Sequence, residues 1–201
     1  MKKHFLIHKL YEIGAIKFGE FKLKNGIITP VYIDLRLTFS YPKLLVTLSE
    51  LIYERVRDKK YDLVCGVPLT GLPIATVISI QHSIPMLLCR KERKEYGTQR
   101  QIEGVYEPSM RCLIFEDVIT SGQSIFETIN PLKEEKIVVE DIALVVDREQ
   151  GGKEHLESKG FKVHPVISLS AILDELLKEK KITEEMHISV TEFIRNHQTH
   201  G

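Results

Sequence analysis

The sequence predicts an α/β fold in which a central, mainly parallel sheet is flanked by helices. Four short runs of Val, Ile and Leu are nearly continuous rather than alternating, which is typical of strands covered on both faces. Stretches with helical character separate most of these runs, so that strands and helices alternate along the chain. The 201 residues, 43% of them hydrophobic, suit one soluble domain, and we expect residues 1–201 to form it.

The first expected element is an amphipathic helix within residues 1–20. Two lysines precede an apolar stretch there, but His4, His8, Lys9 and Glu12 interrupt it before a signal-peptide core could form. The two histidines share a helical face, yet the sequence shows no third ligand for a metal, so we assign them no role.

Residues 41–59 carry apolar side chains at three- and four-residue spacing, with Ser40 as the expected N-cap and Pro42 in the first turn. This pattern predicts a surface helix with one buried stripe. The remaining elements are expected in the following order: a strand at 63–67, a helix at 71–81, strands at 85–89 and 112–115, a helix at 123–135, a strand at 142–146, a short helix at 153–158, a strand at 161–167, and helices at 169–179 and 184–196.

The segment between Cys89 and Cys112 breaks this alternation. Its first eleven residues contain five cations, and it has few apolar positions and glycines at 97 and 104. We expect a long mobile loop, which in a compact domain usually has a function.

Composition excludes several classes of partner. With 28 basic and 28 acidic residues the net charge is zero, so no global field attracts nucleic acid or an anionic membrane, and we expect neither as a partner. No apolar run reaches the length of a membrane span. The three cysteines are odd in number and far apart, each in or beside an apolar strand, which indicates core positions in a protein of the reducing cytoplasm.

The strongest chemical signal is CLIFEDVITSGQS, residues 112–124, in which an apolar strand ends in two acids and a hydroxyl-rich turn opens a helix. The backbone amides of residues 120–124 and the helix N-terminus can cradle a phosphate, and Gly122 permits close approach. Glu116 and Asp117 can instead accept hydrogen bonds from sugar hydroxyls. A phosphate beside a diol describes a ribose 5-phosphate, so we expect such a site here.

This segment resembles the PRPP-binding signature of type I phosphoribosyltransferases, and the other motifs narrow the resemblance to the orotate phosphoribosyltransferase family. Within this family, the motifs most resemble those of the animal form that is fused to orotidine 5′-phosphate decarboxylase. The decarboxylase half, a (β/α)₈ barrel of about 250 residues, would not fit in this chain. The resemblance implies a small N-terminal hood and a long flexible catalytic loop. The matching segments, in the family's order, are FKLKNG (21–26), PVYIDLR (30–36), CGVPLTGLP (65–73), RKERKEYGTQRQIEG (90–104), the acidic strand end and DREQGGKEHL (147–156).

The resemblance also implies roles for residues, a Mg²⁺ cofactor and a homodimer whose loops close over the partner's site. The implied catalytic residues are Arg90, Lys91, Lys94 and Asp117. The implied orotate ligands are Lys24, Tyr32, Ile33, Thr120 and Arg148. The implied PRPP ligands are Leu69, Thr70, Arg90, Lys91, Lys94, Tyr96, Glu116, Asp117, Val118, Ile119, Thr120, Ser121, Gly122, Gln123 and Ser124.

Several alternatives remain open from the residues alone. Lys24 on its own would be a solvated lysine, and Arg148, between two acids, would be a surface ion pair. The role of Tyr96 is open, because many bacterial family members have histidine there. Gly66 and Gly71 have the spacing of a nucleotide P-loop, but no lysine follows, which excludes an ATPase. Two other functions are a PRPP-sensing regulator without catalysis and a phosphoribosyltransferase for another base.

Overall fold

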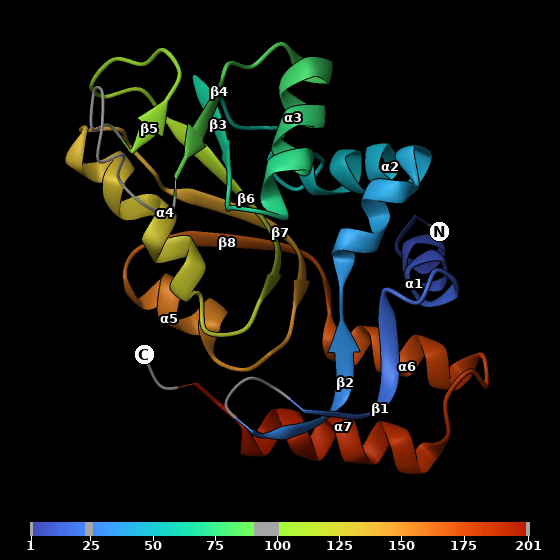
Figure 1. Ribbon diagram of the computed structural model, residues 1–201. Coiled ribbons are helices and arrows are strands. Elements are labelled where there is room, and N and C mark those ends of the chain that lie inside the picture. The colour runs from blue at the N-terminus through green and yellow to red at the C-terminus, as the bar shows by residue number, and fades with distance from the viewer. Residues whose placement is uncertain (1, 23–25, 91–100, 200–201) are drawn as a thin grey trace.

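A central sheet runs through the computed structural model, which describes residues 2–22, 26–90 and 101–199 (Figure 1). Its strand order is β5-β4-β3-β6-β7-β8. Neighbouring strands are parallel except for the β4–β5 pair, which confirms the mainly parallel sheet. The strands are β3 (Leu63–Gly66), β4 (Met86–Cys89), β5 (Ile102–Glu103), β6 (Cys112–Ile119), β7 (Asp141–Asp147) and β8 (Lys162–Ser168).

Helices cover both faces of this sheet (Figure 1). Successive side chains of β6 point to opposite faces, so Leu113 and Phe115 join one core cluster while Cys112 and Ile114 join the other. The first cluster includes side chains of α1 (Lys2–Glu12), α2 (Pro42–Tyr53), α3 (Gly71–His82) and α6 (Leu169–Lys178). The second includes side chains of α4 (Gln123–Glu134) and α5 (Gly152–Ser158).

A separate two-stranded antiparallel sheet consists of β1 (Ile16–Lys22) and β2 (Ile28–Ile33). Val31 of β2 is fully buried in a small cluster with Leu169, Leu173 and Val190, the last from α7 (Glu184–Asn196). This hairpin with its supporting helix lies at the N-terminal position where the family resemblance implies a hood.

The N-terminal region differs from the sequence prediction, because its helix stops at Glu12 and residues 16–22 form a strand. Gly14 adopts a left-handed φ of 72°, which turns the chain out of the helix. Ile16 then pairs with Ile33, seventeen positions further on. A long-range partner, rather than local periodicity, thus decides the conformation of this segment.

Several smaller predictions were also wrong. Helix α2 is capped by Tyr41, because the predicted cap Ser40 ends a preceding 3₁₀ helix, Leu35–Ser40. The predicted strand at 112–115 continues to Ile119, since β7 pairs with it along that length. Within the predicted loop, Ile102 and Glu103 form β5 against the end of β4, whereas residues 91–100 lie outside the described part of the chain. Helix α2 also ends at Tyr53 rather than at residue 59. The other predicted helices and strands are confirmed to within a few residues.

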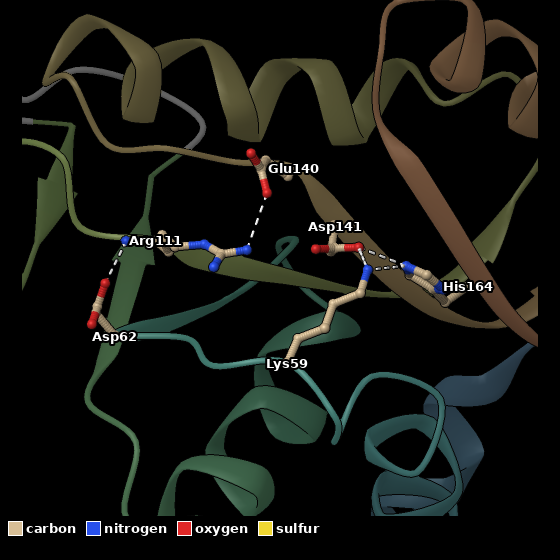
Figure 2. Close-up of polar contacts among 6 residues, drawn as sticks. All are labelled: Lys59, Asp62, Arg111, Glu140, Asp141 and His164. Atoms are coloured by element: carbon tan, nitrogen blue, oxygen red, sulfur yellow. Dashed lines mark hydrogen bonds and ion pairs between the residues drawn. The ribbon is translucent and has the colours of Figure 1, made fainter.

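Charged side chains gather at the amino ends of the strands (Figure 2). Asp141, the first residue of β7, is 1% exposed and accepts a hydrogen bond from the Lys59 ammonium, and its Oδ1 lies 2.7 Å from His164 Nε2. Beside it, Arg111 Nη2 donates to Glu140 Oε2 at 3.1 Å. Since Asp141 is a buried carboxylate, its partners are required to offset the cost of removing it from water.

Candidate active site

The sheet has a topological switch point between β3 and β6. The chain leaves β3 through α3 toward β4 on one side, and leaves β6 through α4 toward β7 on the other. The two connections diverge, which leaves a crevice at the carboxyl ends of these strands, where open α/β sheets bind ligands. The crevice is flanked by the hydroxyl-rich turn at 120–124, predicted to hold a phosphate, and by the turn after β3, which contains the implied PRPP ligands Leu69 and Thr70.

The turn after β3 lies directly against β6. Val67 N donates to Phe115 O at 2.8 Å, and a Cβ atom on Gly71 would lie 2.3 Å from that same carbonyl oxygen. A Cβ atom on Gly66 would lie 2.3 Å from Gly71 O, so both positions require glycine. Leu69, at the tip of the turn, is 71% exposed.

The acid pair near the end of β6 is unequal in its surroundings. Glu116 is 5% exposed, and its two oxygens accept from Asp117 N and Ser124 Oγ, each at 2.9 Å. Burial raises the pKa of Glu116 well above its usual range, and the charge of Asp117 raises it further. Burial also raises the pKa of the partly exposed Asp117. A hydroxyl-rich ligand or a cation at this edge would stabilise the ionised form of Asp117.

The hydroxyl-rich turn that follows is shaped by Gly122, which adopts a φ of 81° as the N-cap of α4. Ser121 Oγ accepts from Gln123 N at 3.4 Å, and the amides of Ile125 and Phe126 donate to Gly122 O, each at 3.1 Å. Val118 and Ile119 are the last two residues of β6, the strand that leads into this turn. The turn thus lies at the N-terminus of α4, the position where the sequence predicts a phosphate.

Arg148 follows β7 and lies next to this turn. Its backbone amide donates to Ile119 O at 3.1 Å, and its side-chain Nε donates to Gln150 Oε1 at 2.9 Å. The alternative of a surface ion pair is wrong for the described part of the chain, because Glu149 instead accepts from the Ser170 amide and hydroxyl. Burial lowers the pKa of Arg148, as expected for a guanidinium that lacks a carboxylate partner.

Arg90 lies where the β4 strand ends. Its Nε donates to Glu103 Oε1 of β5 at 2.9 Å, and its backbone amide donates to Gln101 O. A small cavity brings this arginine together with the turn after β3 and the start of α4. The cavity is lined by Val67, Pro68, Cys89, Arg90, Ser124, Glu127 and Thr128. Arg90 thus lies beside the turn after β3 and the start of α4, next to the hydroxyl-rich turn.

Tyr32 and Ile33 end the β2 strand. Ile33 packs against the core, whereas the Tyr32 hydroxyl accepts from Arg36 Nη2 at 3.3 Å. Arg36 is held in turn by two hydrogen bonds to Asp34, whose charge reaches Asp117 and contributes to raising its pKa. Asp34 of the PVYIDLR segment thus acts electrostatically on Asp117.

Known proteins provide an independent comparison. A family model described as the phosphoribosyl transferase domain matches residues 40–177. The uridine 5′-monophosphate synthase of Bos taurus is 45% identical over 192 residues, which make up 94% of this chain and 40% of that protein. The orotate phosphoribosyltransferase of Caenorhabditis elegans is 41% identical over 178 residues, 88% of this chain and 78% of the relative. The chain belongs to the orotate phosphoribosyltransferase family.

A solved structure supports the same fold. The UMP synthase of Leishmania donovani superposes with a TM-score of 0.86 at 30% identity, over 96% of this chain and 42% of that one. The chain thus spans less than half the length of the two synthases that it matches. These similarities confirm the type I phosphoribosyltransferase fold and the resemblance to the fused animal form.

Four residues that the family resemblance implies lie outside the described part of the chain: Lys24, Lys91, Lys94 and Tyr96. Their roles stay predictions from the sequence. The three cysteines are free and buried, as expected, and burial raises the pKa of Cys65 to about 12 and that of Cys89 to about 11. None of the helices among the described residues has the length and hydropathy needed to cross a bilayer.

The histidines of α1 do meet a third potential metal ligand, which corrects the sequence analysis. His4 Nδ1 lies 2.5 Å and His8 Nε2 lies 3.6 Å from Glu175 Oε1 on α6. Glu175 is far away in sequence, so spacing along α1 could not find it. Both histidines already pair with Glu175, and we interpret the three side chains as a polar contact that joins α1 to α6.

Sequence reasoning also missed the residues that hold the loop after β7. Gly152 opens α5 so close to Thr120 that a Cβ atom would lie 2.4 Å from the Thr120 carbonyl oxygen. Gln150 is 5% exposed and contacts both Arg148 and the chain beyond α7. The adjacent glycines of the DREQGG motif were the available signal, because paired glycines often mark close backbone approach.

Proposed function

We propose that this chain transfers the 5-phosphoribosyl group from PRPP to orotate, giving orotidine 5′-phosphate and pyrophosphate in pyrimidine (UMP) biosynthesis. The observation that carries the proposal is the junction of Arg148 with the hydroxyl-rich turn, joined by the 3.1 Å hydrogen bond to Ile119 O. It puts a cation suited to orotate's carboxylate or carbonyl groups next to a cradle suited to a phosphate. Named orotate phosphoribosyltransferases among the relatives support the choice of base.

In this reaction the bond between ribose C1 and the diphosphate oxygen breaks, and a bond from orotate N1 to C1 forms. Orotate N1 loses its proton readily, so no covalent intermediate with the protein is needed. Positive charge develops on the ribose and negative charge on the leaving diphosphate. Catalysis therefore depends on alignment of the two substrates and on cations placed at the diphosphate, for which Arg90, Lys91 and Lys94 are proposed.

We also propose Mg²⁺ as the cofactor, held mainly through the diphosphate of PRPP. The donors at the acidic edge fit this ion, because Asp117 supplies a carboxylate at the mouth of the crevice, and Mg²⁺ prefers oxygen ligands and retains waters. Bound there, the ion would neutralise charge on the leaving diphosphate. Glu116 fits less well, since both of its oxygens already accept hydrogen bonds.

The proposal includes a homodimer in the cytoplasm, with active sites shared between subunits and with orotate and PRPP as small-molecule substrates. Closure of each catalytic loop over the partner's site would exclude water from the reacting ribose. Three free, buried cysteines and no disulfide among the described residues are consistent with a reducing compartment.

A panel of bases offered with PRPP and Mg²⁺ tests the function. We expect the purified protein to consume orotate and to leave hypoxanthine and uracil unchanged, because only orotate presents a carboxylate to Arg148. Product would be identified as orotidine 5′-phosphate by chromatography, with heat-treated protein as the control. Turnover of hypoxanthine or uracil but not orotate would contradict the choice of base, and nucleic-acid retention on a filter without any turnover would favour the PRPP-sensing regulator.

A further inference from the structure

Gln150 connects the proposed orotate-binding arginine to the end of the chain. Its side chain is 5% exposed, and both ends of the carboxamide are used: Oε1 accepts from Arg148 Nε at 2.9 Å, and Nε2 donates to His197 O at 2.9 Å. Among the described residues no other side chain has a hydrogen bond to the Arg148 guanidinium. An amide can satisfy these opposite requirements at once because it is both donor and acceptor.

The chain after α7 is fastened to the same loop by its backbone. Thr199 N and Oγ1 donate to Gln150 O at 2.8 and 2.5 Å, and Gln198 Nε2 donates to Glu149 O at 2.9 Å. We call residues 197–199 the C-terminal strap. The strap lies so close to Gly151, whose φ is 92°, that a Cβ atom there would be 2.5 Å from Thr199 O. Glycine is needed at position 151 both for the left-handed backbone conformation and for the close approach of the strap.

The strap also reaches the phosphate side of the site, since Thr199 Oγ1 lies 3.4 Å from Thr120 O. It therefore touches the two segments that carry the proposed orotate and phosphate ligands. A guanidinium has five N–H donors, and with Nε bound by Gln150 the four on its terminal nitrogens are left to face a ligand. Fixing Nε sets the plane of the guanidinium, which a two-point contact to orotate requires.

We propose that Gln150 is a positioning residue for orotate, and that the C-terminal strap holds Gln150 in place. The proposal rests on the proposed function, because it takes orotate as the ligand of Arg148. Orotate binding should then depend on residues 197–199, which act indirectly, through their hydrogen bonds to Gln150.

The test measures the KM for orotate and for PRPP separately. Gln150→Met keeps the size of the side chain and removes both hydrogen bonds, and we expect it to raise the orotate KM about tenfold, with the PRPP KM changed less than about twofold. Gln81→Met, at an exposed position of α3, is the matched control and should leave both constants unchanged. Arg148→Met is the reference and should raise the orotate KM further.

The strap is tested without changing the loop. Thr199→Val removes one hydroxyl, and a chain shortened to residue 196 removes the whole strap but leaves α7; both should raise the orotate KM selectively. A chain shortened to residue 199 is the control. These variants also keep the proposal testable if Gln150→Met fails to fold, which circular dichroism would reveal.

The outcomes separate this proposal from the proposed function. A selective rise in the orotate KM for Gln150→Met and for the chain shortened to residue 196 supports it. An unchanged orotate KM in these variants, while Arg148→Met raises it, overturns the positioning role and leaves the function standing. Equal rises in both KM values would show general disruption and would also overturn it. A wild-type protein that consumes no orotate overturns the proposed function itself.

Discussion

Replacing Asp141 with asparagine is expected to lower the free energy of unfolding by about 3 kcal/mol, the lower end of what is found when one partner of a buried ion pair is removed. Asp141 is 1% exposed and holds both Lys59 and His164. The variant leaves the Lys59 ammonium without its carboxylate. Because the side chain of Lys59 is about a third exposed, water can solvate part of that charge, which limits the loss. Urea denaturation monitored by circular dichroism would measure it.

Asp174→Asn is the matched control for this prediction. Asp174 also pairs with a histidine, His187, at 2.9 Å, but its side chain is 73% exposed, so the loss should be below about 0.5 kcal/mol. Removing Lys59 as well, with Lys59→Met, should cost less than the sum of the single changes, since the two groups interact. Equal small losses for Asp141→Asn and Asp174→Asn would show that the buried cluster contributes nothing special.

The same cluster predicts a dependence on pH. Burial alone would raise the pKa of Asp141, but hydrogen bonds from Lys59 and His164 outweigh it, and the folded pKa lies below the ordinary value of 3.8. A lowered carboxyl pKa stabilises the fold fully above the unfolded pKa, and this contribution is lost as the pH falls through the folded value. The difference in stability between wild type and Asp141→Asn should therefore shrink as the pH falls below about 4.

Lys94→Ala should raise the barrier to turnover by about 2–4 kcal/mol, a loss of about 30- to 1,000-fold in kcat, while the fold stays intact. The reason is the negative charge that develops on the leaving diphosphate, which one preorganised cation can stabilise by this amount. Steady-state kinetics with saturating orotate and PRPP would measure the loss. Lys162→Ala, at an exposed position at the start of β8, is the control with the same change of charge. Near wild-type turnover of Lys94→Ala would exclude this lysine from the mechanism.

Mixing two inactive variants would show whether the sites are shared. If Lys94 acts in the partner's site, a heterodimer of Lys94→Ala with Asp117→Asn contains one intact site and one doubly altered site. Random mixing makes half of the dimers mixed, so activity should return to about a quarter of wild type. No recovery after the mixed dimers have been shown to form would contradict shared sites.

Most of the sheet was predictable because its strands are buried on both faces. The runs at Leu63, Cys112 and Ile142 are apolar throughout, and local composition alone marks such strands. The β1–β2 hairpin was not predictable in this way. Its strands are partly exposed, its register shifts between Phe18 and Phe21, and its stability comes from packing on α7. Its conformation is therefore decided by contacts between segments far apart in the sequence.

The residues of the candidate site likewise fall into those that local sequence reveals and those that depend on distant contacts. Contiguous motifs, such as the acidic strand end with its hydroxyl-rich turn, could be found in the sequence because one segment supplies all of their groups. Gln150 and Thr199 could not, since their contacts join the loop after β7 to the turn after β6 and to the chain beyond α7. Their importance depends on which distant backbone lies beside them.

The ion cluster of Asp141 and the loop of Arg148 lie at opposite ends of the same strand, β7, which runs from Asp141 to Asp147. Side chains at the amino end can consequently be exchanged without altering the crevice at the carboxyl end. A library confined to Arg111 and Glu140, which leaves both partners of Asp141 in place, would be a practical route to heat-tolerant forms of this protein that keep their choice of base.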